Sequence, residues 1–237
     1  NYRTVNESGL YTGVTVKVNA RFKVDAYADV FRFPWLKYRS SAPSDGKDFL
    51  LQGSYTPNKK TALLLRYNYR QGSENTLLPD NPVKVLMQIT STRIRFQWSL
   101  QANKQLSVKT RLEYNRYEAG EGAQQGWMIY QDAAYHFPHM PFVISGRLSR
   151  FRTSSYDTRI YATESSVLYE NAVSQLYGRG WQYYLNLKWK VNRRFACWGR
   201  FHQTLYQDTA GIGSGNDIVA GNKKTMFQFQ LQYIFYK

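Results

Sequence analysis

Residues 225–237, with the sequence TMFQFQLQYIFYK, decide the fold because apolar and polar side chains alternate along them with a period of two. The predicted strand has an aromatic-rich apolar face, Phe227, Phe229, Leu231, Tyr233 and Phe235, and a polar face, Gln228, Gln230 and Gln232. An exposed apolar sheet face of this length needs a covering layer. The layer is lipid if the strand belongs to an outer-membrane barrel, and a second sheet if it belongs to a soluble β-sandwich.

Length and hydropathy limit the ways in which this chain could cross a membrane. The 237 residues have a mean hydropathy of −0.57, and the chain is long enough for one all-β domain of barrel size. The sequence contains no uninterrupted apolar run of about 20 residues, as a membrane-spanning helix requires. A chain of this kind crosses a bilayer only as a closed barrel, in which half of each strand faces a polar lumen.

Period-two patterns recur along the whole chain and predict eleven strands, near residues 10–18, 22–32, 48–56, 60–70, 87–100, 104–118, 126–137, 141–152, 180–191, 194–206 and 224–236. Short turns are predicted near residues 19–20, 57–59, 102–104, 138–140 and 192–194. Long polar loops are predicted at roughly residues 34–47, 71–86, 119–125, 153–179 and 207–222. Tight turns at one rim and long loops at the other are typical of outer-membrane barrels, with the long loops outside the cell. We therefore predict an antiparallel up-and-down transmembrane β-barrel, with residues 1–237 as a single domain or a segment of one.

The predicted strand count is odd. The first strand runs into a short turn and the last one ends at the same periplasmic rim, whereas single-chain bacterial barrels have even counts. We expect at least one further strand upstream of residue 1, so that the chain is the C-terminal part of a longer barrel. Alternatives are a short strand in residues 1–9 or a hairpin within Thr158 to Tyr169. A barrel of about twelve strands would have a modest lumen, filled by side chains or a loop.

Charge indicates an anionic partner. The chain has 32 Lys and Arg against 16 Asp and Glu, a formal charge of +16, which suits nucleic acid, lipopolysaccharide or anionic solutes. By strand parity ten cations face the lumen: Arg66, Arg70, Arg93, Arg95, Lys109, Arg111, Arg147, Lys188, Lys190 and Arg200. They would favour anions in a pore. Alternatively, they pair with Glu113, Asp132 and other inward acids and simply fill the interior. A third interpretation, a nucleic-acid surface of basic and aromatic side chains, has no specific spacing to support it.

No pattern of catalysis is recognisable. The histidines His136, His139 and His202 have no metal-ligand spacing with a cysteine or an acid cluster, and we expect no metal and no cofactor. Asp157 and Glu164, both in the loop at 153–179, are expected to form a solvated edge rather than an acid/base pair. The single cysteine, Cys197, excludes an intrachain disulfide and falls on the lipid-facing side by parity.

Several stretches carry a resemblance to a known family: residues 156–162 (YDTRIYA), Glu164, 167–169 (VLY), 178–180 (GRG), 183–187 (YYLNL) and 212–215 (IGSG). They resemble the C-terminal region of a group of large Bacteroidota envelope proteins with helix-hairpin-helix domains. The resemblance covers roughly the last third of the chain. It implies that upstream residues hold the first strands and the helical hairpins, and that the protein lies in the outer membrane of a Bacteroidota bacterium. Surface lipoproteins or other outer-membrane proteins are then possible partners at the long loops, beside lipid and lipopolysaccharide.

From these observations we expect a membrane-embedded structural or pore component of an envelope complex that is not an enzyme. The alternative is a DNA or polyanion uptake protein with a basic lumen.

Overall fold

The computed structural model describes residues 6–76, 83–120, 122–213 and 215–235, and almost all of them lie in strands or in the connections between strands. The elements are β1 (Ser8–Lys17), β2 (Phe22–Phe33), β3 (Ser44–Asn58), β4 (Thr61–Thr76), β5 (Val85–Gln101), β6 (Leu106–Ala119), β7 (Gly122–His136), β8 (Phe142–Thr153), η1 (Tyr156–Thr158), β9 (Ile160–Thr163), β10 (Val173–Leu176), β11 (Arg179–Lys190), β12 (Phe195–Tyr206), β13 (Gly211–Ile212), η2 (Gly215–Asp217), β14 (Val219–Ala220) and β15 (Lys223–Tyr233).

Eleven strands form one antiparallel sheet in the order β1-β2-β3-β4-β5-β6-β7-β8-β11-β12-β15, as the sequence pattern predicts. Each strand pairs with its neighbour in the chain, except where the two small hairpins β9–β10 and β13–β14 interrupt the order. Pairing is continuous along most strands, with a single register irregularity in β3–β4 between Tyr55 and Asn58. The fourth loop does contain a hairpin, but it differs from the alternative placed within Thr158 to Tyr169: its second strand, β10, lies at Val173–Leu176, and neither strand joins the main sheet, so the count stays odd.

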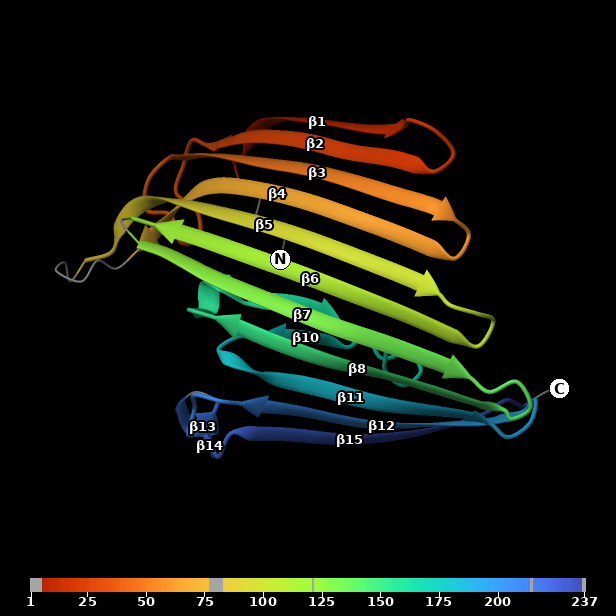
Figure 1. Cartoon of the computed structure of the whole chain (residues 1–237). Helices are drawn as coiled ribbons and strands as arrows, with labels where there is room; N and C mark the ends of the chain where they lie inside the picture. Colours follow the sequence, from red (N-terminus) through yellow and green to blue (C-terminus); the bar gives the residue numbers. More distant parts are fainter. Residues whose placement is uncertain (1–5, 77–82, 121, 214, 236–237) are drawn as a thin grey trace.

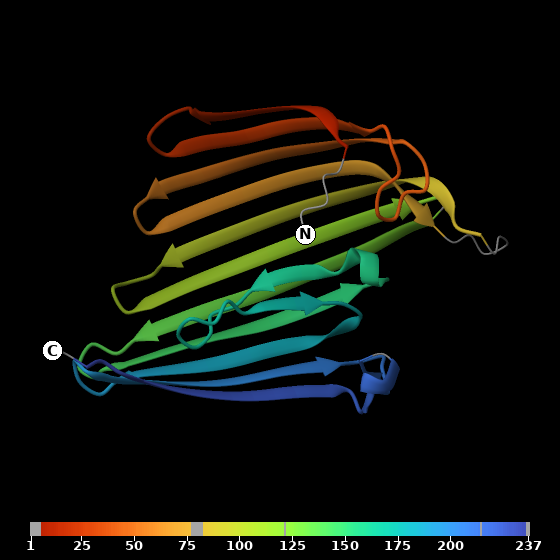
Figure 2. The same ribbon diagram turned by 180° about the vertical axis from the view of Figure 1, so that it is seen from behind.

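The sheet bends into a trough with β1 and β15 at opposite edges (Figures 1 and 2). The five short turns that the sequence predicts lie at one rim, and the longer connections lie at the other rim together with the short β6–β7 connection (Figure 1). Both edge strands run toward the tight-turn rim, and within the described ranges they do not pair with each other.

One predicted loop is wrong. Instead of a loop at residues 119–125, β6 ends at Ala119 and β7 begins at Gly122, and these two residues pair with each other. Gly120 adopts a φ of 66°, which glycine tolerates without strain, and this helps the chain reverse direction within two residues. Glycines here mark a tight reversal rather than a long connection.

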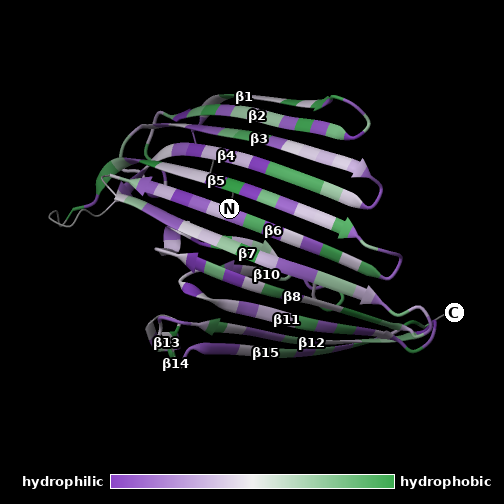
Figure 3. Ribbon diagram, in the orientation of Figure 1, coloured by the Kyte–Doolittle hydropathy of each residue, from purple (hydrophilic) through white to green (hydrophobic). Residues whose placement is uncertain are grey.

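The two faces of the sheet differ in chemistry, and the hydropathy colours alternate along the strands in Figure 3. The convex face carries large apolar side chains that are exposed, among them Phe229 at 72% and Leu231 at 55% in β15. The same alternation continues through β5, where Phe96 and Trp98 are exposed, and β11, where Leu185 is exposed. The apolar face predicted from residues 225–237 thus extends over the sheet, with Tyr236 and Lys237 outside the described residues.

Residues 154–178, between β8 and β11, fold back into the trough and lie against its concave face (Figure 2). We call them the lumenal loop; it contains η1, β9 and β10. The hydrophobic core cluster forms between this loop and the wall and consists of Met128, Tyr130, Phe151, Ile160, Ala162 and Leu176. A single curved sheet has no second layer of its own, so the loop supplies one.

Candidate functional site

The concave face holds the ten cations that the sequence places there: Arg66, Arg70, Arg93, Arg95, Lys109, Arg111, Arg147, Lys188, Lys190 and Arg200. The strand register links them into rows. Lys109, Asp132, Arg147 and Tyr184 follow one another across β6, β7, β8 and β11, and Arg66, Arg95 and Glu113 do so across β4, β5 and β6.

Two acids of the wall neutralise four of these cations. Glu113 binds Arg95 with an Nε to Oε2 distance of 2.8 Å and also pairs with Arg111. Asp132 binds Arg147 at 2.5 Å and Lys109 at 3.0 Å. The predicted pairing of lumenal cations with Glu113 and Asp132 is therefore present. These ion pairs form two clusters, one that links β5 to β6 and one that links β6, β7 and β8.

Other lumenal cations have no carboxylate partner in the described part of the chain. Arg66 donates through Nε to the amide oxygen of Gln52 at 2.8 Å. Arg70, Arg93, Lys188 and Lys190 form no ion pair with an acid among the residues that the structure describes. The concave face consequently retains an excess of positive charge.

The lumenal loop is anchored near its start by apolar packing. Ile160 is fully buried, and its neighbours in the cluster include Phe151 of the wall, which is also fully buried. At Gly126 of β7 a Cβ would lie 2.5 Å from the carbonyl oxygen of Thr158. A glycine there lets the loop backbone approach the wall closely.

Farther along, the loop is held by polar contacts. Glu164 forms an ion pair with Arg200 of β12, and both side chains are 1% exposed. The carbonyl oxygen of Ser165 accepts hydrogen bonds from Arg200 Nη1 at 2.7 Å and from Asn186 Nδ2 at 2.8 Å. The backbone N–H of Ser165 donates to the hydroxyl of Tyr184 at 3.2 Å. These contacts fix the tip of the loop against β11 and β12.

Glu164 titrates unusually for a buried acid. Burial acts to raise the pKa of its carboxyl, but the nearby His202 and Ser174 side chains and the charge of Arg200 outweigh that effect. The pKa of Glu164 is therefore lowered from its ordinary value, and the carboxylate stays charged.

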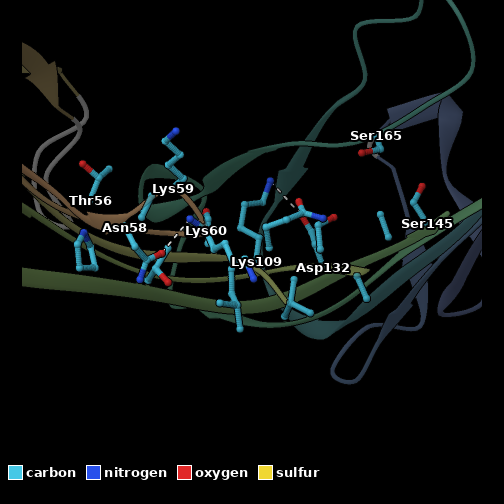
Figure 4. A pocket seen from close by; sticks show the side chains of 18 of the residues that line it. Thr56, Asn58, Lys59, Lys60, Lys109, Asp132, Ser145 and Ser165 are labelled. Atoms are coloured by element: carbon cyan, nitrogen blue, oxygen red, sulfur yellow. Dashed lines mark hydrogen bonds and ion pairs between the residues drawn. The ribbon is translucent and has the colours of Figure 1, made fainter. Parts of the chain in front are cut away.

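A cavity of about 890 Å³ lies between the tip of the loop and the tight-turn rim (Figure 4). Ser165 and Tyr184 line it on the loop side, and Lys59 and Lys60 line it on the rim side. Lys109 also lines it and pairs with Asp132. The cavity is open and is lined by both polar and apolar side chains, and it leads from the rim up to the Ser165 contacts.

Sequence reasoning missed the importance of the lumenal loop. Glu164 is buried and paired with Arg200, so the expectation of a solvated edge is wrong for it, while Asp157 is 45% exposed as expected. The sequence does carry a signal, because Met128, Tyr130 and Phe151 are large apolar or aromatic residues at neighbouring inward positions of β7 and β8. Inward apolar side chains require a covering segment, and the longest loop is the one that covers them.

Two negative findings concern the described residues only. No helix among them is long and apolar enough to cross a membrane. No group of three or more His, Cys, Asp or Glu side chains in the same ranges could hold a metal ion.

Comparison with known proteins shows the fold. No family model and no curated protein matches the sequence. Among solved structures, the copper transporter OprC matches 95% of this chain with a TM-score of 0.52 at 9% identity. A Pseudomonas aeruginosa FadL homologue matches 97% at a TM-score of 0.45 and 11% identity, and the RagAB peptide importer matches 98% at 0.45 and 10%.

The chain spans 40% of the length of the OprC chain, 68% of the FadL homologue and 44% of the RagAB chain. The likeness to OprC, together with the antiparallel order and the apolar convex face, shows that the chain has the fold of an outer-membrane β-barrel.

Proposed function

We propose that this chain is part of the wall of an outer-membrane pore that favours anions and is narrowed by its own lumenal loop. The observation that carries the proposal is the concave face, where Arg70, Arg93, Lys188 and Lys190 lack ion pairs with described acids. Rings of Lys and Arg favour anions in a pore because their positive charge attracts anions and repels cations.

The unpaired edge strands, β1 and β15, support a barrel with more strands than the eleven described. In lipid an open sheet edge leaves backbone N–H and C=O groups without partners, at a cost of several kcal/mol each. Because β1 and β15 run in the same direction, an odd number of further strands closes the barrel with antiparallel pairs throughout. We propose that residues outside this sequence supply them, as the greater length of the OprC chain allows.

The bacterial group from which the protein comes and its partner proteins are also part of the proposal. We propose that the protein lies in a Bacteroidota outer membrane and that surface lipoproteins are its partners. Both proposals rest on the resemblance of residues 156–215 to the helix-hairpin-helix envelope proteins. The longest connections, 154–178 and 207–222, start and end at the rim opposite the tight turns, and we propose the second of them as the place where a partner docks.

Bilayer recording tests the pore directly. The full-length protein is reconstituted into a planar bilayer with a gradient of KCl, and the reversal potential gives the ratio of chloride to potassium permeability. We expect chloride to be favoured, and we expect Arg93→Gln, Lys188→Gln and Lys190→Gln together to reduce the preference. The matched control removes three charges outside the trough with Arg32→Gln, Arg116→Gln and Arg152→Gln, and it should leave the preference unchanged. A silent protein, or a conductance without anion preference, contradicts the proposal.

A further inference from the structure

Acidic residues are distributed unevenly along the wall. The inner face of β6 and β7 has Glu113 and Asp132, but β8, β11, β12 and β15 contain no Asp or Glu at any position. Arg147 of β8 reaches the carboxylate of Asp132 on the adjacent β7. Arg200 on β12 lies two strands farther along the sheet, and its ion-pair partner within the described ranges is Glu164 of the lumenal loop. The wall therefore positions a buried cation for which it provides no anion of its own.

From this arrangement we infer that the inner face of β11 and β12 carries a carboxylate-binding site, built from Arg200, His202 and Asn186, which Glu164 occupies in this structure and which a solute carboxylate occupies when the loop tip withdraws. The inference deepens the proposed function, because such a solute would meet this site inside the lumen.

Glu164 satisfies the site incompletely. The Oε1 atom of Glu164 and the Nε atom of Arg200 are buried and have no hydrogen-bond partner, and the same holds for Oδ1 of Asn186. His202 Nε2 lies 3.7 Å from Glu164 Oε2 and is also without a hydrogen bond. Buried polar groups are normally paired, so the loop leaves the Nε donor of Arg200 unused.

A free carboxylate can make the missing contacts. The Arg200 guanidinium contacts Glu164 through Nη2 and Ser165 through Nη1, which leaves Nε unused. Arginine binds carboxylates most strongly through two parallel N–H donors, and a small solute is not constrained by the backbone of a loop. Because a carboxylate already occupies the site, we assign the ligand to that class rather than to phosphates.

The site is also within reach of solvent. Tyr184 and Ser165 line the open cavity, and both lie next to Arg200: its guanidinium carbon is 4.9 Å from the ring of Tyr184, and its Nη1 binds the carbonyl of Ser165. Movement of the loop tip alone would open Arg200 to the cavity, while the apolar anchor at Ile160 stays in place.

Binding of glutarate to the detergent-solubilised full-length protein tests the inference, measured by isothermal titration calorimetry. Glu164 is a tethered competitor, so Glu164→Gln should lower the apparent Kd for glutarate by at least about ten-fold relative to the parent. Adding Arg200→Met to Glu164→Gln should abolish the gain. Glu170→Gln is the matched control: it removes another carboxylate of the loop, which accepts a hydrogen bond from Gln228 and forms no ion pair with Arg200, and it should leave the Kd at the parent value.

Ile160→Ala is a second way to free the site, because it loosens the loop without altering Arg200, His202 or Asn186. It should therefore also strengthen glutarate binding. Equal Kd values for Glu164→Gln and Glu170→Gln, or binding that survives Arg200→Met, would overturn the site. Tighter binding of inorganic phosphate than of glutarate would overturn the assigned class. The binding assay needs no conductance, so a silent bilayer with intact glutarate binding refutes the pore and leaves the site standing.

Discussion

Replacement of Ile160 by alanine tests whether the lumenal loop is a separately docked layer. Ile160 is fully buried in the cluster with Phe151, Leu176 and Met128, and it reaches the sheet only as part of the loop. Removing a buried isoleucine side chain to alanine costs about 2–5 kcal/mol. At about 3 kcal/mol the equilibrium for undocking of the loop rises by roughly 150-fold, since each 1.4 kcal/mol is a factor of about ten.

Hydrogen exchange measured by mass spectrometry on the refolded protein separates the loop from the wall. We expect Ile160→Ala to accelerate amide exchange in peptides covering residues 160–176 and to leave β11 and β12 protected, because their ladder hydrogen bonds do not depend on the loop. Ile218→Ala is the control, because Ile218 lies in another loop and is 59% exposed. Unchanged exchange in the loop, or equal acceleration in β11 and β12, would refute the idea of a docked layer.

Three further outcomes are expected. Phe229→Arg should reduce the free energy of unfolding in lipid vesicles by about 2–4 kcal/mol if the residue lies near the bilayer midplane, whereas Gln230→Arg on the lumenal face should cost less, as urea titration can show. The pKa of Glu164 is lowered from 4.5, so the contribution of its carboxylate to loop docking is complete above pH 4.5 and is lost as the pH falls through the lowered pKa. Amide exchange in the loop, corrected for its intrinsic pH dependence, should therefore rise only below pH 4.5. A rise between pH 5 and 8 would contradict this. Gly126→Val should displace the loop through the contact with Thr158 and should accelerate its proteolysis, while strand protection stays unchanged.

Much of the fold is predictable from local pattern, because a period of two places alternate side chains on opposite faces without any knowledge of distant contacts. Phe227 and Gln228 take the faces expected of them, and so do Cys197 and Arg200. The connection at residues 119–125 was predicted wrongly because glycine signals either a tight reversal or a flexible loop, and pairing of Ala119 with Gly122 decides between them.

The candidate site is harder to predict, because it depends on where a long connection folds. Glu164 has no neighbour in sequence that reveals its partner, and Arg200 is far away in the chain. What brings them together is the apolar anchor formed by Ile160 with Met128 and Phe151. In the sequence, the sign of this anchor is that Met128 and Phe151 fall at inward positions of the predicted strands.

The single cysteine permits a direct measurement of whether the convex surface faces lipid. Cys197 lies beside Leu231 and Trp189 in the register of β12, on the apolar side. A nitroxide attached to Cys197 in lipid vesicles should collide frequently with oxygen, which concentrates in lipid, and rarely with a water-soluble nickel chelate. Lys188→Cys in a Cys197→Ser background reports the lumenal side and should show the reverse. Frequent collision of the Cys197 label with the nickel chelate, at the level of the Lys188 position, would contradict the account.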